Sequence, residues 1–199
     1  MPLTSPVSEV PSPGRRNAAE RILRGTAERL IIMGAAELSM QDVADAAGVS
    51  KALIHYHYRD KESLLEQVAT WATAQVLERE RSALDGATAS TAVDAVWRWL
   101  DEELDGGHLR LLLELGQYRV PRVRIAVQES LRVRREAATD SIRHLFELLE
   151  LRPRVPVELL ARVVVAFIDG LASHPRGDDS RDVRVTFDVF WLSLLSLAE

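Results

Sequence analysis

The stretch SMQDVADAAGVSKALIHYHYRDK, from Ser39 to Lys61, constrains the fold of this chain more than any other. The Ser39 hydroxyl can cap the first turn of a helix, and Asp42, three residues later, can bond back to it. Gly48 stands where that helix has to end, because glycine adopts the positive φ of a helix C-terminus without strain. Ser50 can cap a second helix after a single intervening residue, so the two helix axes have to cross steeply. The spacing predicts a helix-turn-helix.

The second of these helices has two faces of different chemistry. At about 100° per residue, Ile54 and Tyr58 fall on one face, where they can pack inward. The opposite face carries a small residue, an imidazole, a phenol and a guanidinium, namely Ala52, His55, Tyr56 and Arg59. Such a face suits a DNA major groove, because the small residue permits close approach and the others offer donors to bases or phosphates. An ordinary helical hairpin with a solvated outer face is the alternative.

Several short motifs in and around this stretch match one family of proteins. The residues concerned are Gly34, Leu38-Ser39-Met40, Val43-Ala44, Ala46 to Lys51, His55 to Tyr58 and Lys61 to Leu65. They resemble the TetR family of bacterial transcriptional regulators, and the resemblance covers about residues 18–68. The chain departs from the family pattern at four positions, Ala52, Leu53, His55 and Tyr58. These differences bear on the DNA sequence that would be read and leave the expected fold unchanged.

The resemblance implies an all-α protein with two parts. Residues 15–62 would form a three-helix helix-turn-helix domain that binds DNA, and residues 63–199 a helical domain that binds a small-molecule effector and forms a dimer. Residues 1–14 are rich in Pro and Ser with little to bury, which predicts a disordered tail. Arg15 and Arg16 could reach the DNA as an arm, or they could be merely solvated. No cofactor is expected.

The rest of the chain has the pattern of helices, without the sustained alternation of strands. A stripe of apolar residues predicts a first helix that begins at Arg15 and ends at Gly34. A fourth helix is expected from Lys61 to about Leu84, followed by a loop over residues 85–91. Five further helices are expected at about 91–104, 109–118, 121–150, 157–173 and 181–197. The fourth helix would be the mechanical link between the two parts.

Charge and composition exclude several classes of protein. The net charge of −5 argues against a protein that coats nucleic acid, whereas residues 15–62 carry eight Lys or Arg and seven Asp or Glu, a local balance of +1. Cysteine is absent, so thiolate chemistry and disulfides are excluded. No apolar run is long enough for a membrane span, and the N-terminus has no signal-peptide pattern, so a cytoplasmic protein is expected.

The expected DNA contacts follow from the faces of the second helix and from the resemblance. Ala52, His55 and Tyr56 would face bases. Phosphate contacts and the positioning of the helix would come from the remaining candidates, Ser39, Ser50, Lys51, His57 and Lys61. Lys61 would act together with the amide groups at the start of the fourth helix.

The last two expected helices, LLARVVVAFIDGLA and VTFDVFWLSLLSLA, are apolar over more than one stripe. A helix of this kind has to be covered on two sides. In the family that the chain resembles, the corresponding helices pair with their copies in a second subunit, which implies a two-fold homodimer. Two symmetric recognition helices would read a palindromic operator with half-sites about 34 Å apart.

An effector pocket is harder to place. The large residues available to line one are Trp71, Trp97, Trp99, Tyr118, Phe146 and Phe167, with core packing as the alternative for each. Polar residues inside apolar runs are also candidates, since a buried carboxylate needs a partner. Glu114 and Gln117 are expected at the pocket for this reason, whereas Asp169 is expected to pair with an arginine of the long 121–150 helix.

Catalysis is not expected. His55 and His57 are two residues apart on a helix, so their side chains point to different faces and cannot chelate one metal together. His108, His144 and His174 are isolated, and Asp101 to Glu103 fits a solvated helix face. The sequence contains no phosphate loop, nucleophile elbow or dinucleotide fingerprint.

The sequence therefore predicts a ligand-responsive regulator of transcription, most simply a repressor that leaves its operator when a small molecule binds. An effector-binding or protein-interaction module with the same fold and little DNA affinity is the alternative. The apolar Leu53 and the shortage of lysine, which occurs only at Lys51 and Lys61, favour that alternative.

Overall fold

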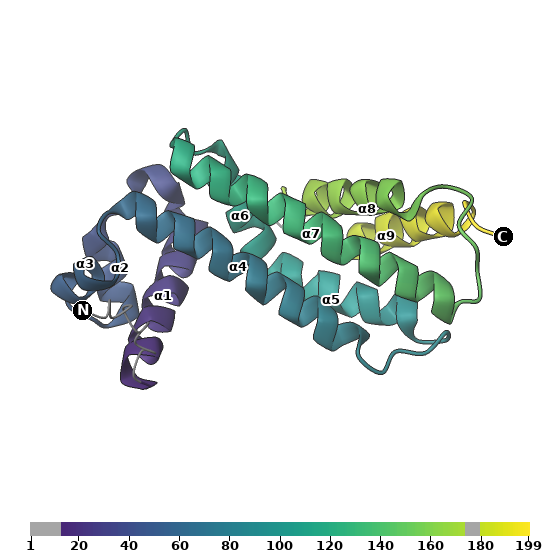
Figure 1. Ribbon diagram of the computed structural model, residues 1–199, viewed down its shortest axis with the longest axis horizontal. Helices are drawn as coiled ribbons and strands as arrows, with labels where there is room; N and C mark the ends of the chain where they lie inside the picture. Colours follow the sequence, from purple (N-terminus) through teal and green to yellow (C-terminus); the bar gives the residue numbers. More distant parts are fainter. Residues whose placement is uncertain (1–12, 174–179) are drawn as a thin grey trace, which may run out of the picture.

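The computed structural model describes residues 13–173 and 180–199, and it confirms the all-α prediction. These residues form nine helices (Figure 1). Their bounds are α1 Pro13–Glu37, α2 Met40–Ala47, α3 Lys51–His57, α4 Lys61–Leu84, α5 Ala92–Gly106, α6 His108–Gln117, α7 Pro121–Leu148, α8 Val157–Ala172 and α9 Ser180–Leu195. Within the described residues, β structure is limited to one isolated bridge, between Pro153 and Ala198.

The predicted helix boundaries hold to within about two residues, except that α1 ends at Glu37, three residues beyond the predicted end at Gly34. The first helix begins at Pro13 and not at Arg15, and most of the predicted tail lies outside the described residues. Gly34 interrupts this helix as expected, because its φ of 76° and ψ of 165° are not helical. Among the described helices, none combines the length and apolar character needed to cross a membrane.

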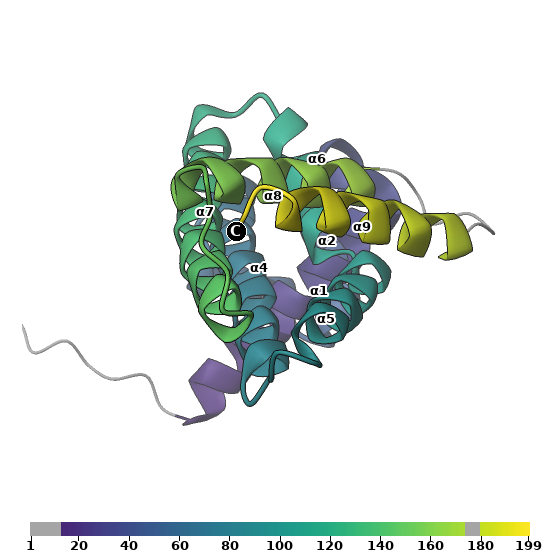
Figure 2. The ribbon, with the colours of Figure 1, turned by 90° about the vertical axis from the view of Figure 1, so that its right-hand side faces the viewer.

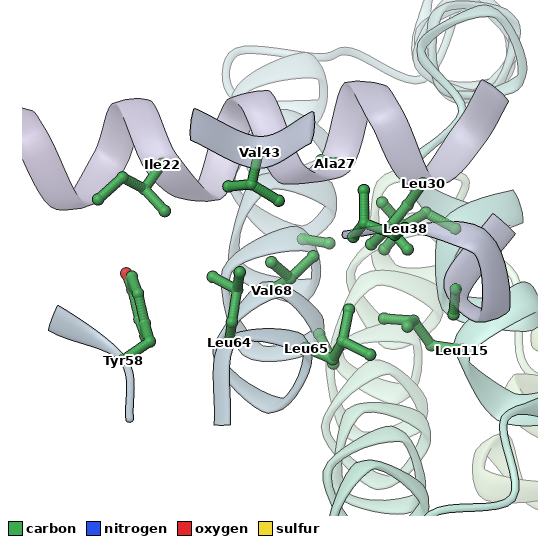
Figure 3. Close-up of a cluster of buried hydrophobic side chains, with 14 of the residues drawn as sticks. Ile22, Ala27, Leu30, Leu38, Val43, Tyr58, Leu64, Leu65, Val68 and Leu115 are labelled. Atoms are coloured by element: carbon green, nitrogen blue, oxygen red, sulfur yellow. The ribbon is translucent and has the colours of Figure 1, made fainter. Parts of the chain in front are cut away.

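A first hydrophobic core holds α1, α2, α3 and the beginning of α4 together (Figure 3). Ile22, Val43, Ile54, Leu64 and Leu65 are each fully buried in it. The core does not stop at the predicted domain boundary after residue 62, since it also takes in one side of α6 through the following residues: Leu111, Leu112 and Leu115. The helix-turn-helix is therefore packed directly on part of the second half of the chain.

Two glycines allow close approaches in this region. A Cβ on Gly25 would lie 2.9 Å from the backbone nitrogen of Ala47, so α1 passes against the end of α2 at a distance that only glycine permits. A Cβ on Gly107, which has a φ of 73°, would lie 3.0 Å from Ile31. The start of α6 is thereby held against the end of α1.

A second core joins the remaining helices. The long helices α4 and α7 lie side by side (Figure 1), and α8 and α9 lie across them, with α5 on the side opposite α7 (Figure 2). Phe187, Leu100, Leu109 and Ala161 are among its most buried members. Because α4 contributes Val76 to this core and Leu64 to the first, a displacement of α4 reaches both.

Polar side chains tie these helices together in the interior. Arg134 of α7 donates from Nη2 to Asp169 Oδ1 of α8 at 2.5 Å, which confirms the predicted pairing of Asp169 with an arginine of the long helix. Thr73 and Ser130 share a buried hydrogen bond of 2.5 Å between α4 and α7. Each pair satisfies polar groups that would otherwise be costly to bury.

One expectation about the acidic run Asp101 to Glu103 is wrong. Glu103 is fully buried and not on a solvated face. Its carboxylate accepts a hydrogen bond from Arg79 of α4 and lies 3.6 Å from His108 Nδ1 of α6. Burial raises the pKa of Glu103, while Arg79 opposes that rise. The partners of Glu103 lie on other helices, α4 and α6. The local sequence therefore cannot distinguish this buried position from a solvated one.

Candidate functional site

Capping residues fix three helix ends in the helix-turn-helix: the start of α2, the end of α2 and the start of α3. Ser39 and Asp42 form a capping box, in which Ser39 N donates to Asp42 Oδ2 at 2.9 Å and Asp42 N donates to Ser39 Oγ at 3.2 Å. These bonds lower the pKa of Asp42. Gly48 follows α2 with a φ of 60°, and Ser50 caps α3 by accepting a bond from Leu53 N at 3.2 Å. Every cap predicted for this motif is confirmed.

The inner face of α3 is apolar, as predicted. Ile54 is fully buried, and Tyr58, which ends the helix, is 8% exposed. The Tyr58 ring points into the first core beside Leu64 and below Ile22 (Figure 3). Burial raises the pKa of the Tyr58 phenol. This contact sets the rotation of α3 about its own axis, so the opposite face is presented outward.

The outer face of α3 consists of the residues that the sequence placed there. Ala52, His55 and Tyr56 are exposed, and so are Lys51 before them and Arg59 after them. The Tyr56 side chain is 59% exposed, an unusual state for an aromatic residue. His57 is half-buried, with its ring 5.5 Å from Tyr56 and 6.1 Å from Tyr58 between centroids. His55 and His57 thus point to different surroundings, as predicted from their spacing.

The two remaining candidates are engaged within the protein. Ser39 is exposed, and its hydroxyl donates to Asp42 Oδ2 at 2.5 Å. Lys61 is half-buried, and its ammonium donates to the carbonyl oxygen of Ala36 at 3.3 Å and lies 5.9 Å from the centre of the Tyr118 ring. Burial lowers the pKa of Lys61. The bond to Ala36 uses one of the three N–H donors of the Lys61 ammonium and leaves two for other acceptors.

The start of α4 is capped more completely than expected. Asp60 accepts a hydrogen bond from Ser63 N at 2.7 Å, and Asp60 N donates to Ser63 Oγ at 3.3 Å. The carboxylate of Asp60 therefore occupies part of the helix end at which a phosphate was expected, and its bonds to Ser63 lower its pKa. Of the two expected contributors at this end, Lys61 is the better placed to meet a phosphate.

An interior cavity lies in the second core, between α4, α5, α7, α8 and α9. Its free volume is about 50 Å³. Most of its walls are apolar, and its polar members are Glu80, Arg134 and Ser141. The other lining residues are Val76, Leu77, Leu84, Val96, Trp99, Ala138, Ile142, Leu145, Val164, Val165, Ile168 and Trp191.

Of the eight residues considered for an effector pocket, Trp99 lines this cavity, whereas the other seven do not. Glu114 and Gln117 are exposed on α6, so the expectation that they are buried is wrong. Trp71 lies against His108, with tilted rings whose centroids are 5.5 Å apart, and Tyr118 ends α6 beside Lys61. The other three pack in the second core: Trp97 against Phe187, Phe167 in a stack with Phe190 at 3.8 Å, and Phe146 among buried apolar side chains.

Sequence reasoning missed Glu80, Ser141 and Arg134. Glu80 occurs in the polar run ERERS, and Arg134 in VRRE, which resemble solvated helix surface. Only the packing of α4 against α7 turns both side chains inward, and no local signal shows this. For Glu114 the error runs the other way, since the apolar residues around it face inward while Glu114 itself faces solvent.

Within residues 13–173 and 180–199, no three His, Cys, Asp or Glu side chains are grouped as a metal site would require. His174, one of the isolated histidines, lies outside the described residues.

Comparisons with known proteins bear on both the motif and the fold. Residues 22–68 match the family described as "Bacterial regulatory proteins, tetR family". No curated protein matches significantly. Among solved structures, a TetR-family transcriptional regulator from Rhodococcus sp. is 19% identical, with a TM-score of 0.73 over 90% of this chain and 99% of that one.

Two other similar structures show the same arrangement. Salmonella enterica GusR is 19% identical, with a TM-score of 0.70 over 90% of this chain and 95% of its own. FadR from Bacillus subtilis, solved in complex with stearoyl-CoA, is 18% identical, with a TM-score of 0.62 over 77% of this chain and 84% of its own. Residues 22–68 thus match the tetR family of bacterial regulatory proteins in sequence, and the chain as a whole has the fold of these solved structures.

Proposed function

We propose that this protein is a ligand-controlled repressor of transcription, which binds a palindromic operator as a homodimer and leaves it when a small molecule occupies the helical domain. The observation that carries the proposal is the outer face of α3. Its exposed small, imidazole and phenol side chains are held outward by the burial of Ile54 and Tyr58 on the other side of the same helix. An exposed tyrosine on a rigidly held helix has the character of a recognition surface.

The proposed contacts divide into two kinds. Ala52, His55 and Tyr56 would meet base edges in the major groove. Ser39, Ser50, Lys51, His57 and Lys61 would meet phosphates or position the helix. The Ser50 hydroxyl accepts the capping bond and can still donate to a phosphate. Arg59 is exposed at the end of the same face. We propose residues 15–62 as the DNA-binding unit and residues 63–199 as the unit for the effector and the dimer.

The dimer would form through α8 and α9. Each helix has one buried apolar stripe and one exposed apolar stripe. The exposed stripes consist of Leu159 and Val163 on α8 and Val185, Val189 and Leu192 on α9, all between 49% and 68% exposed. The two helices lie side by side, with Phe167 and Phe190 stacked between them, so the stripes can form one surface. Covering this surface with its own copy gives a two-fold contact and two symmetric recognition helices.

Effector binding would be coupled to DNA binding through α4. The free volume of the interior cavity, about 50 Å³, is far below the several hundred Å³ of a usual ligand pocket. A ligand must therefore push its walls apart, and α4 supplies Val76, Leu77, Glu80 and Leu84 to those walls. The related FadR structure, in complex with stearoyl-CoA, supports a small-molecule role for this fold. A ligand that binds the displaced state about a hundredfold better supplies roughly 2.7 kcal/mol.

The proposal can be tested by selecting bound sequences from a random duplex library with the full-length protein. The expected product is an inverted repeat with half-sites about one helical turn apart. A variant with His55→Ala and Tyr56→Ala together should enrich no repeat, although its helical circular dichroism stays that of the wild type. Failure of the wild type to enrich any sequence would contradict the proposal and favour an effector-binding module with little DNA affinity.

A further inference from the structure

The interior cavity adjoins a groove on the surface, and residues of α4 and α7 lie between the two spaces. Outside it lies an open groove of about 750 Å³, formed by the ends of α4 and α7 and by the loop after α4. Four residues line both spaces: Leu77, Glu80, Leu84 and Ser141. Ser141 Oγ of α7 donates to Glu80 Oε1 of α4 at 2.7 Å, so this hydrogen bond joins the two helices at the wall where the groove and the cavity meet.

The charges at this wall are unbalanced. Arg134, which also lines the cavity, is already paired with Asp169 at 2.5 Å, and its side chain is 7% exposed. The charge of Arg134 also acts to lower the pKa of Glu80, against the effect of burial, so one guanidinium serves the carboxylates of both Asp169 and Glu80. The described residues provide Glu80 with the Ser141 hydroxyl, a neutral donor, at hydrogen-bonding distance. Burial raises the pKa of Glu80, because an ionised carboxylate is poorly solvated there. The cavity thus lacks one positive charge.

We propose that the interior cavity binds hydrophobic monocations, in which an ammonium or quaternary ammonium nitrogen lies beside Glu80 and an apolar body lies among Trp99, Trp191 and the aliphatic walls. The ligand would arrive through the outer groove and replace the Ser141 bond with its own charge. This inference rests on the proposed function, since it assigns a chemical class to the effector.

Charge and wall chemistry both favour a cation over other amphiphiles. An anion would meet the Glu80 carboxylate, and the one guanidinium in the cavity wall, that of Arg134, is already paired with Asp169. A neutral ligand would leave the Glu80 carboxyl desolvated with no compensating charge. A monocation makes the group of charges neutral, and aromatic walls such as Trp99 and Trp191 attract cations through their ring faces. Both indole nitrogens are buried, and the described residues offer them no acceptor, so a hydroxyl or ether oxygen on the ligand would also be accommodated.

The location of the wall also explains how a cation would act on DNA binding. Glu80 and Ser141 join α4 to α7, the two long helices that lie side by side (Figure 1). Replacing this hydrogen bond removes a polar contact between the last turns of α4 and α7. The first turns of α4 carry Leu64 and Leu65 into the core of the helix-turn-helix. Cation binding at Glu80 and the position of the helix-turn-helix would therefore be coupled through the same helix.

The test is calorimetric titration of the full-length protein with three probes that share one tail: octylammonium, 1-octanol and octanoate. Octylammonium is expected to bind at least tenfold more tightly than either of the others. Glu80→Gln should remove this preference, whereas the matched variant Glu78→Gln should keep it. Glu78 lies two residues away on α4, exposed and paired with Arg81.

Equal affinities, a preference for octanoate, or no saturable binding of octylammonium would each overturn the inference, as would an unchanged preference in Glu80→Gln. If Glu80→Gln does not fold, the ranking of the three probes by the wild type decides. The operator selection described above is an independent readout. A protein that selects no operator but prefers octylammonium would refute the proposed function and uphold the cation site.

Discussion

Arg21 Nη2 donates to the carbonyl oxygen of Ala47 at 2.6 Å, and the same nitrogen donates to the carbonyl of Gly48 at 2.9 Å. These carbonyls end α2, where the helix itself leaves acceptors without partners. The turn of the helix-turn-helix is therefore held by a side chain of α1, 26 residues earlier in the chain. The angle between α2 and α3 depends on this contact as well as on Gly48.

Replacing Arg21 with Met is expected to destabilise the fold by about 1 kcal/mol, because charge-assisted hydrogen bonds to two carbonyls are lost from a partly exposed site. Operator affinity should fall about fivefold as the turn loosens. The matched variant is Arg24→Met, one turn further along α1, which loses only an exposed pair with Glu20 at 3.2 Å. Urea unfolding and DNA titration of both variants measure this. Equal effects at the two positions would show that the contact with the turn is unimportant.

The two lysines of the chain are expected to contribute separately to DNA binding. Lys51→Ala and Lys61→Ala should each lower the slope of log affinity against log salt concentration by about one, because each removes one phosphate contact. Arg24→Ala should leave the slope unchanged. A slope unaffected by Lys61→Ala would mean that its ammonium serves only the Ala36 carbonyl, to which it donates at 3.3 Å.

The cluster around Glu103 predicts a dependence of stability on pH. Burial, with a further contribution from Arg79, lowers the pKa of His108 to about 4. Arg79 Nη2 lies 3.1 Å from His108 Nδ1, which fits an unprotonated acceptor nitrogen. The unfolded chain, with a histidine pKa near 6.5, binds the proton more readily. Stability is therefore complete at neutral pH and is lost as the pH falls from about 6.5 towards 4.

Between pH 7.5 and pH 5.0 this histidine should cost the wild type about 2 kcal/mol of unfolding free energy. His108→Gln keeps an acceptor for Arg79 but does not titrate. The unfolding free energy of this variant should therefore fall by about 2 kcal/mol less than that of the wild type over the same pH range. The raised pKa of Glu103 acts in the opposite direction in both proteins, and the difference between them isolates His108. If urea unfolding gives the same dependence of unfolding free energy on pH for the wild type and His108→Gln, the assignment of this dependence to His108 is wrong.

The proposed dimer can be tested with two side chains of equal exposure. Leu192 on α9 is 68% exposed and Ile125 on α7 is 66% exposed. Leu192→Glu should shift the protein from dimer to monomer in sedimentation velocity, because it places a charge in the apolar surface of α8 and α9. Ile125→Glu lies outside that surface and should leave the dimer intact. A wild-type protein that sediments as a monomer would contradict the proposed symmetry.

The sequence predicted the parts of the molecule whose causes are local. The caps at Ser39 and Ser50, the left-handed Gly48 and the inward Ile54 and Tyr58 each depend on neighbours within a few residues. The same reasoning located the helices closely, because apolar spacing and Gly or Pro breaks are also local signals. One non-local pairing, Asp169 with an arginine of α7, was predictable because a carboxylate in a strongly apolar helix needs a partner.

The cavity could not be predicted in this way. Glu80, Glu103 and Arg134 occur in polar runs, and whether such a residue faces solvent or another helix depends on how α4, α5 and α7 are rotated against one another. Glu114 shows the converse, since apolar neighbours made it look buried although it is exposed. Polar residues on helices that are packed on two sides are therefore the ones for which local sequence is least informative.

The most direct test of the account is the affinity of a labelled duplex carrying the selected operator, measured by fluorescence anisotropy at one salt concentration for the wild type, Tyr56→Ala and Gln128→Ala. Gln128 is exposed on α7 and lies outside the proposed DNA surface. The account predicts that Tyr56→Ala weakens operator binding at least tenfold, while Gln128→Ala binds as the wild type does. Wild-type binding to the operator no tighter than to a scrambled duplex, or full affinity in Tyr56→Ala, would contradict it.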